Sequence, residues 1–182
     1  MNIFKIENLF YQNSNVGRIS KLLFHYELYK KIKDLDGHIV ECGVFKGVSL
    51  IRFLSFIKIF KDNKKWVYGF DAFGKFPSTN RIEDKKFADR HNKNLGNGLS
   101  IDKLKKKLVK KKFKNFKLIK GNILDTIDKF LLKKKNFKIS LLHLDLDVFV
   151  ATNFALEKLY PLVVKNGVII LDDYKHVSGT TR

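Results

Sequence analysis

Two short acidic stretches each follow an apolar run: Leu144-Asp145-Leu146-Asp147 and Leu171-Asp172-Asp173-Tyr174. The apolar runs, 139–142 and 168–170, are typical of parallel strands that are buried on both faces. Carboxylates crowded at the ends of such strands repel one another and lose solvation on burial, so they need a compensating partner. Oxygen ligands at the carboxyl ends of parallel strands suit a hard cation such as Mg²⁺.

Strand and helix patterns alternate outward from these stretches along the whole chain. We expect strands at 37–43, 66–71, 116–119, 139–144 and 168–171, and helices at 19–32, 49–60, after an N-cap at Ser100, and at 152–162. This alternation predicts an α/β fold with a doubly wound, mostly parallel sheet. By its length, the chain 1–182 is expected to be a single domain that begins with a helical N-terminal segment, residues 1–36.

Two further expectations concern the irregular parts of the chain. The segment 74–98 has no sustained hydrophobic period, and we expect a long surface loop that acts as a lid, because such segments in compact domains are usually functional. The chain ends soon after the fifth strand, so the last strands of a doubly wound sheet are expected to be missing. An uncovered strand edge and the apolar segment 3–11 predict self-association.

The net charge of +19 comes mainly from lysine, because only five of the 37 basic residues are arginine. Proteins that read nucleic acid usually depend on the bidentate fork of arginine. The lysine clusters 105–107 and 110–112 are expected on the solvated face of a helix, so no nucleic-acid partner is predicted. The alternative, a lysine-driven nucleic-acid binder, predicts an affinity that falls steeply with salt.

Membrane and secretory signals are not found in the sequence. No apolar run approaches the roughly 18 residues that cross a bilayer, and the first residues lack the pattern of a signal peptide. Cys42 is the only cysteine, which favours a reducing compartment. We therefore predict a cytoplasmic protein without a membrane span.

A glycine turn, Glu41-x-Gly43-x-x-x-Gly47, follows the first expected strand. It lacks the second glycine of the dinucleotide fingerprint, which argues against NAD. The looser pattern, with an acid two residues before the first glycine, suits S-adenosylmethionine, which has no pyrophosphate. Asp71 ends the second strand and is placed to accept hydrogen bonds from ribose hydroxyls. Asp125, after the third strand, is expected near the adenine or the lid.

Several stretches together resemble the macrocin O-methyltransferase family over roughly residues 18 to 180. These are class I, Rossmann-like enzymes that use S-adenosylmethionine and Mg²⁺ to methylate sugar hydroxyls. The stretches that carry the resemblance are Val40-Glu41-Cys42-Gly43-Val44-Phe45-Lys46-Gly47, Gly69-Phe70-Asp71-Ala72-Phe73, Leu142-His143-Leu144-Asp145-Leu146-Asp147, Leu159-Tyr160-Pro161 and Asn166-Gly167-Val168-Ile169-Ile170-Leu171-Asp172-Asp173-Tyr174.

The resemblance implies a role for each candidate site residue. Asp145, Asp172 and Asp173 would ligate Mg²⁺, and Asp147 would be the general base. The residues that would contact the cofactor are Glu41, Gly43, Gly47, Ser49, Asp71 and Asp125. Two places depart from the family pattern: residues 149–152 lack the tyrosine, the acid and the serine that are common there, and His143 stands where an arginine is common.

The leading hypothesis is therefore an O-methyltransferase that acts on a sugar or another small molecule with a vicinal diol. Mg²⁺ chelated by two neighbouring hydroxyls would lower the pKa of the attacked one, and Asp147 would take its proton. The alternative is a truncated, non-catalytic methyltransferase-like domain that binds the cofactor or a partner chain. Methyl transfer to a nucleotide sugar would distinguish the two.

Overall fold

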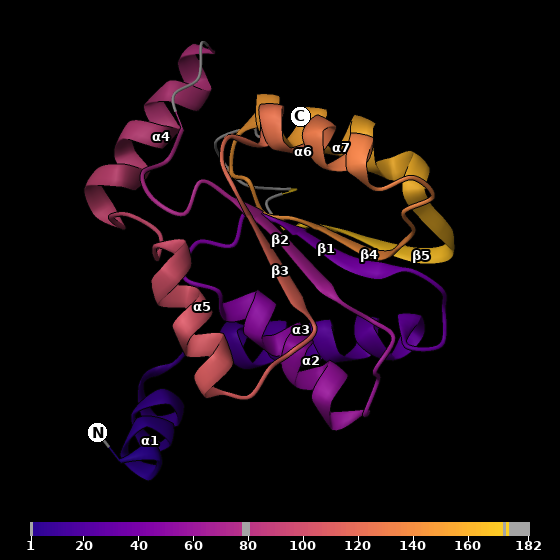
Figure 1. The fold of residues 1–182 in the computed structure, drawn as a ribbon. Coiled ribbons are helices and arrows are strands. Elements are labelled where there is room, and N and C mark those ends of the chain that lie inside the picture. The colour runs from indigo at the N-terminus through magenta and orange to yellow at the C-terminus, as the bar shows by residue number, and fades with distance from the viewer. Residues whose placement is uncertain (1, 78–80, 173, 175–182) are drawn as a thin grey trace.

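Five parallel strands form one sheet in the order β3-β2-β1-β4-β5 in a computed structural model that describes residues 2–77, 81–172 and 174 (Figure 1). The strands are β1 (His38–Cys42), β2 (Val67–Asp71), β3 (Phe116–Lys120), β4 (Ile139–Leu144) and β5 (Val163–Leu171). Every pair of neighbouring strands is parallel, which confirms the predicted doubly wound α/β fold.

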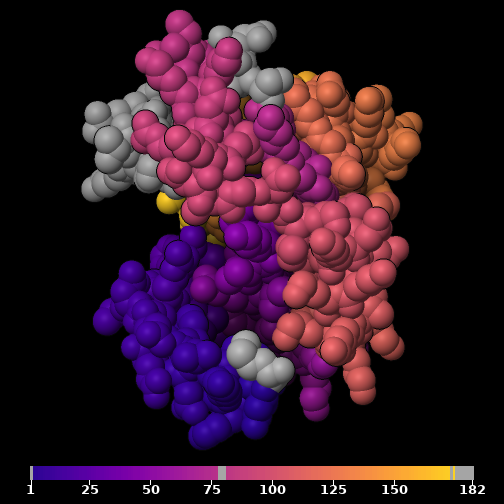
Figure 2. Space-filling model, turned by 90° about the vertical axis from the view of Figure 1, so that its left-hand side faces the viewer, coloured from indigo at the N-terminus to yellow at the C-terminus, as the bar shows by residue number. Residues whose placement is uncertain are grey.

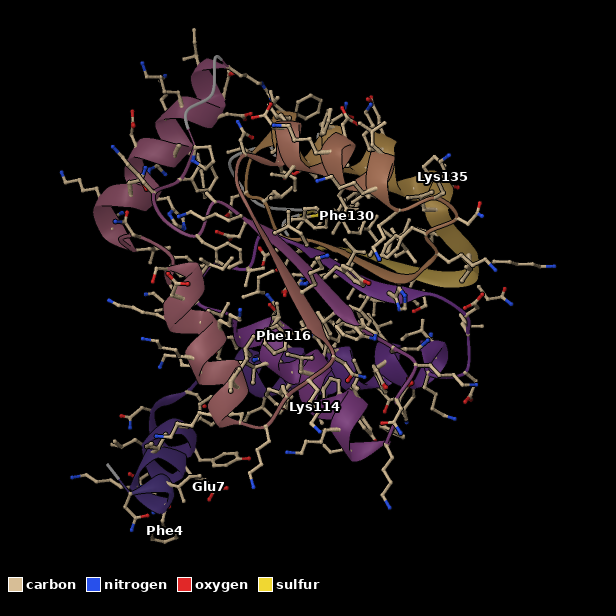
Figure 3. All side chains as sticks on the ribbon, viewed as in Figure 1. Phe4, Glu7, Lys114, Phe116, Phe130 and Lys135 are labelled. Atoms are coloured by element: carbon tan, nitrogen blue, oxygen red, sulfur yellow. The ribbon has the colours of Figure 1, made fainter. Side chains whose placement is uncertain are left out.

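Helices cover both faces of this sheet. One face carries α2 (Val16–Ile32) and α3 (Val48–Ile59), and the other carries α6 (Ile123–Lys133) and α7 (Phe149–Leu159) (Figure 1). Each face has its own apolar core. Phe130 points from α6 into the second core, where its ring packs on Phe70 and Phe137 (Figure 3). A short 3-10 turn, Tyr160–Leu162, connects α7 to β5.

Strand register brings the acidic stretches to one edge. All six residues of β4 are buried, as its mainly apolar sequence predicts. Cys42 of β1 is level with Leu144 of β4, and Leu144 is level with Leu171 of β5. The strand order reverses between β1 and β4, the place where open α/β sheets have a crevice for ligands at the carboxyl ends of the strands.

The prediction of a loop over the whole of 74–98 is wrong, because α4 (Ile82–Asn94) lies within it. This helix packs little of its surface on the body: only Asp84 and Ala88 are buried. Few apolar residues were needed to hold it, so the helical period was too weak to recognise. By contrast, the predicted N-cap at Ser100 is confirmed, since its side chain accepts from the backbone N–H of Lys103 at the start of α5 (Ile101–Lys110).

The first helix, α1 (Ile3–Asn13), projects from the body and has no buried residue (Figure 1). Phe4 and Glu7 both point away from the rest of the molecule (Figure 3), and Ile3 is 82% exposed. The predicted self-association through this apolar segment stays a prediction. In the described part of the chain, no helix has both the length and the apolar character needed to cross a bilayer.

The ends of β1 and β4 meet at Gly43 without room for a side chain. Its φ is +90°, and a Cβ there would lie 1.7 Å from the carbonyl oxygen of Asp145. Asp145 in turn donates its backbone N–H to the carbonyl of Cys42 at 2.9 Å. Only glycine combines this conformation with this approach.

We therefore expect Gly43→Ala to lower the free energy of unfolding by about 3 kcal/mol, because it adds both a clash and backbone strain. Urea denaturation followed by circular dichroism measures the change. Gly74→Ala is the matched control, since a Cβ there would meet nothing closer than 3.9 Å. Equal stabilities of the two variants would contradict this account of the turn.

Candidate active site

A cavity of about 430 Å³ lies at the carboxyl ends of β1 to β4. This volume is within the usual range for small-molecule and cofactor sites. The side of the molecule seen in Figure 2 has α4 at the top and α5 and the N-terminal segment below it. From α4 and the residue before it, His91 and Arg81 reach the cavity. The strand ends contribute Gly43, Asp71, Gly121, Asn122, Asp145 and Asp147.

Asp71 shapes the wall of this cavity through its carboxylate. Oδ2 accepts from the backbone N–H groups of Val44 and Phe45 at 2.7 and 2.8 Å, and Oδ1 accepts from Phe73 at 2.5 Å. Phe45 and Phe73 both have left-handed backbone conformations, which the three hydrogen bonds help to hold. Asp71 thus fixes the glycine turn, and its predicted contact with the ribose stays a prediction.

Asp145 and Asp147 lie in the loop between β4 and α7, and both line the cavity. Asp147 has φ of +59°, an uncommon conformation for a residue other than glycine. Residues held in such conformations cluster at active sites, where the surrounding structure enforces them. The role of Asp147 as the general base stays a prediction.

A second polar group is buried on the side of the sheet covered by α2 and α3. Nδ1 of His143 lies 3.2 Å from Glu41 Oε1, which also accepts from the hydroxyl of Ser49. Nε2 of His143 lies 3.6 Å from Asp172 Oδ1, whose other oxygen pairs with Lys21. His143 and Glu41 are both fully buried. These polar and charged side chains contact one another across β1, β4 and β5, next to the carboxyl ends of the strands.

The pKa values follow from these contacts. Burial opposes a charge on His143, but the carboxylates of Asp172 and Glu41 outweigh it and raise the pKa of His143 to about 9. Burial would raise the pKa of Asp172, yet His143 and Lys21 hold it below its ordinary value. His25 of α2 behaves oppositely: burial, then the nearby positive charge of His143, lower its pKa to about 3.

The predicted site residues fall into two groups. Gly43, Asp71, Asp145 and Asp147 line the cavity, whereas five others are not among its lining residues: Glu41, Gly47, Ser49, Asp125 and Asp172. Glu41 instead contacts His143 and accepts from the hydroxyl of Ser49, and Asp125 is exposed in the first turn of α6. Asp173 lies outside the described residues. The cofactor contacts of the second group stay predictions.

The fit of the residues to Mg²⁺ rests on the ends of β4 and β5. Asp145 and Asp172 directly follow Leu144 and Leu171, which are level with each other in the sheet. Carboxylate oxygens are the ligands that Mg²⁺ prefers, so the donor set fits this ion. Because Lys21 already pairs with Asp172, a cation there has to share that carboxylate with the lysine.

Comparisons with known proteins identify the family of the chain. A family model described as macrocin-O-methyltransferase (TylF) matches residues 23–182. The chain belongs to the macrocin-O-methyltransferase family. The match spans the sheet, the cavity and both acidic stretches. A search of curated proteins found no match.

Solved structures show the same fold. A crystal structure of CalS11, a calicheamicin methyltransferase, is 20% identical with a TM-score of 0.71, over 96% of this chain and 72% of that one. An apo structure of CalS11, described as a TDP-rhamnose 3'-O-methyltransferase, is 20% identical with a TM-score of 0.69, over 100% and 74%. The O-methyltransferase NovP is 20% identical with a TM-score of 0.68, over 80% and 61%.

One contact that sequence reasoning missed joins α4 to the start of α7. Asp84 is 3% exposed, and its two carboxylate oxygens accept from the backbone N–H groups of Phe149 and Val150 at 3.2 and 3.1 Å. The N-cap residue of α7, Val148, makes no side-chain cap, so an acid from α4 takes that role in this family member. Arg81 stacks on the Phe149 ring at 4.6 Å.

Other missed residues come from α2. Lys21 and His25 lie one turn apart and reach Asp172 and His143 from a helix that the sequence predicted only as packing. Their spacing of four places them on one helix face. The sequence contains no signal for these two residues, because their partners are an acid and a histidine on neighbouring strands. Those partners are recognisable only once the strand order is known.

We expect Asp84→Ala to destabilise the protein by about 1 to 2 kcal/mol, because it removes the cap and the favourable charge at the start of α7. Thermal unfolding measures the loss, and limited proteolysis should show faster cleavage within α4. Asp89→Ala, which removes an exposed acid from the same helix, should change neither. Equal behaviour of both variants would show that Asp84 does not anchor α4.

Proposed function

We propose that the chain is an S-adenosylmethionine-dependent O-methyltransferase that methylates a hydroxyl of a sugar or another vicinal-diol small molecule with Mg²⁺ assistance. The observation that carries the proposal is the cavity, where Gly43 and Asp71 of the predicted cofactor side meet Asp145 and Asp147 of the acidic loop. Family membership supplies the reaction class.

The residues around the cavity would have different roles in the reaction. Gly43 lets the backbone of the acidic loop approach the end of β1 at the cavity, and Asp71 holds the glycine turn after β1 in one conformation. Asp145, Asp172 and Asp173 would hold Mg²⁺, which when bound lowers the pKa of a chelated hydroxyl. Asp147 would accept the proton of that hydroxyl as the oxygen attacks the methyl group.

The segment that includes α4 would limit the access of water to this reaction. Arg81 and His91 line the cavity. The ring centroid of His91 lies 5.3 Å from that of Phe45 and 5.3 Å from that of Phe76. These contacts place an aromatic wall across the glycine turn. A wall that excludes water strengthens the electrostatic effect of Asp147 on the reacting oxygen.

For Asp147→Asn we expect transfer to fall by about 10²- to 10⁴-fold, because the amide cannot accept the proton. Release of S-adenosylhomocysteine from a panel of nucleotide sugars measures the rate, and isothermal titration should show little change in S-adenosylmethionine affinity. Asp102→Asn, a change in the first turn of α5, should leave the rate unaltered. A full rate in Asp147→Asn would remove it as the base.

Removal of divalent cations with EDTA should abolish transfer, and added Mg²⁺ should restore it. Asp145→Asn should raise the Mg²⁺ concentration that gives half the maximal rate, since one anionic ligand is lost. S-adenosylmethionine affinity, measured by titration calorimetry, should stay close to that of the unaltered protein. Transfer that persists in EDTA would refute the role of the metal while leaving the methyltransferase assignment intact.

The second candidate function is a non-catalytic domain that binds the cofactor or a partner chain. The exposed apolar residues of α1 favour it, because the chain itself buries no residue of this helix. Binding of S-adenosylmethionine without transfer to any acceptor of the panel would favour this second function.

A further inference from the structure

We propose that His25, His143 and Asp172 form a second metal site, which takes a borderline transition-metal ion such as Zn²⁺ or Co²⁺ rather than Mg²⁺. One nitrogen from each histidine and one carboxylate oxygen all lie within 4.8 Å of one another. The three residues come from α2, β4 and β5. The site shares Asp172 with the proposed Mg²⁺ site and differs from it by two histidine nitrogens.

The nitrogen atoms of this cluster are unusual because they are buried without partners. Among the described residues, neither ring nitrogen of His25 has a hydrogen-bond partner, and Nε2 of His143 lies 3.6 Å from Asp172 Oδ1, beyond hydrogen-bond distance. Both side chains are fully buried. Buried polar atoms almost always find a partner, so one unsatisfied nitrogen of each ring is available to a shared ligand.

The geometry of the two rings favours a ligand between them. Ring centroids of His25 and His143 lie 5.4 Å apart in an edge arrangement, and the separation of His143 Nε2 from Asp172 Oδ1 is 3.6 Å. Ligands of a tetrahedral zinc ion with bonds of about 2.1 Å lie roughly 3.4 Å apart. The ligand atom of His25 lies within 4.8 Å of both other ligand atoms, so binding would draw its ring toward them.

Glu41 and Lys21 supply the outer contacts that such a site needs. Metal-binding histidines usually donate their other ring N–H to a carboxylate, which orients the ring. Glu41 Oε1 lies 3.2 Å from Nδ1 of His143 and leaves Nε2 to face Asp172. Lys21 pairs with Asp172 Oδ2 and leaves Oδ1 for the ion.

The choice of ion follows from the donor atoms. Two imidazole nitrogens and one carboxylate oxygen suit Zn²⁺, Co²⁺ or Ni²⁺, whereas Mg²⁺ prefers oxygen ligands. An ion bound here would join α2 to the two strands that carry the acidic stretches. It would also draw on the carboxylate of Asp172, so excess Zn²⁺ is expected to oppose Mg²⁺ at the neighbouring site.

The test uses the full chain, stripped of metal and titrated with Co²⁺ and Zn²⁺ in the absence of methyl donor and acceptor. We expect one equivalent of Co²⁺ to give the visible absorption of a low-coordinate site, and Zn²⁺ to displace it while Mg²⁺ does not. X-ray absorption of the zinc-loaded protein should show two imidazoles per ion. Fewer than two imidazoles, or no Co²⁺ absorption, would overturn the proposal even if no variant folds.

Variants locate the ion. His25→Phe retains a ring that stacks on Phe53, and it should weaken Zn²⁺ binding by more than about 100-fold because a ligand is lost. Glu41→Gln changes only the outer contact and should weaken Zn²⁺ binding by roughly 10- to 100-fold. His38→Phe is the matched control, because His38 packs among Tyr68 and Phe137 at the other end of β1. Equal Zn²⁺ affinity in His25→Phe and His38→Phe would refute the site. Since the binding assay contains no cofactor, this result is independent of whether the protein transfers methyl groups.

Discussion

The buried contacts of His143 with Glu41 and Asp172 hold together the edge of the sheet on which the site depends. Two carboxylates next to the ends of parallel strands lose solvation, and an unpaired one would be strongly destabilising. Without a metal ion, the raised pKa of His143 keeps the imidazole charged between them, and an ion bound at His143 would take the place of that proton. Removing one partner would leave the others buried without compensation. The register of β1, β4 and β5 is therefore fixed by charge as well as by packing.

This constraint extends to the cavity through the loop after β4. Asp145 lines the cavity and also contributes to the raised pKa of His143, so its charge acts on both sides of the strand ends. Its backbone is held against β1 by the close approach at Gly43. The acidic loop therefore has little freedom to move relative to the glycine turn. Preorganisation of this kind is what a site for methyl transfer between two bound molecules requires.

The sheet could be predicted from the sequence because its strands are short apolar runs that end at glycine or acid residues. The same logic placed Asp145 and Asp147 at the cavity. Sequence reasoning was less successful for a residue that could end a strand or begin a helix. Asp125 was expected at a strand end, but Asn122 caps the helix there through a hydrogen bond to the Leu124 N–H, and Asp125 turns to solvent in the first turn of α6.

Other features depend on contacts between distant segments and have no local signal. Asp84 looks like a surface acid of a polar segment, and only the position of α7 makes it a cap. His25 is a residue on the inner face of a helix until β4 brings His143 beside it. In both cases the polar side chain contacts a residue more than sixty positions away in the sequence.

The two sides of the strand ends therefore have different chemistry. On the side of α6 and α7, the cavity combines an apolar wall with a few oxygen atoms at the strand ends, as a cofactor with a large organic part requires. On the side of α2 and α3, the buried groups are histidines, carboxylates and Lys21. Asp145 lies where the two meet. For the methyl transfer that we propose, such a boundary would place an apolar pocket for the donor next to the carboxylates that hold the acceptor oxygen.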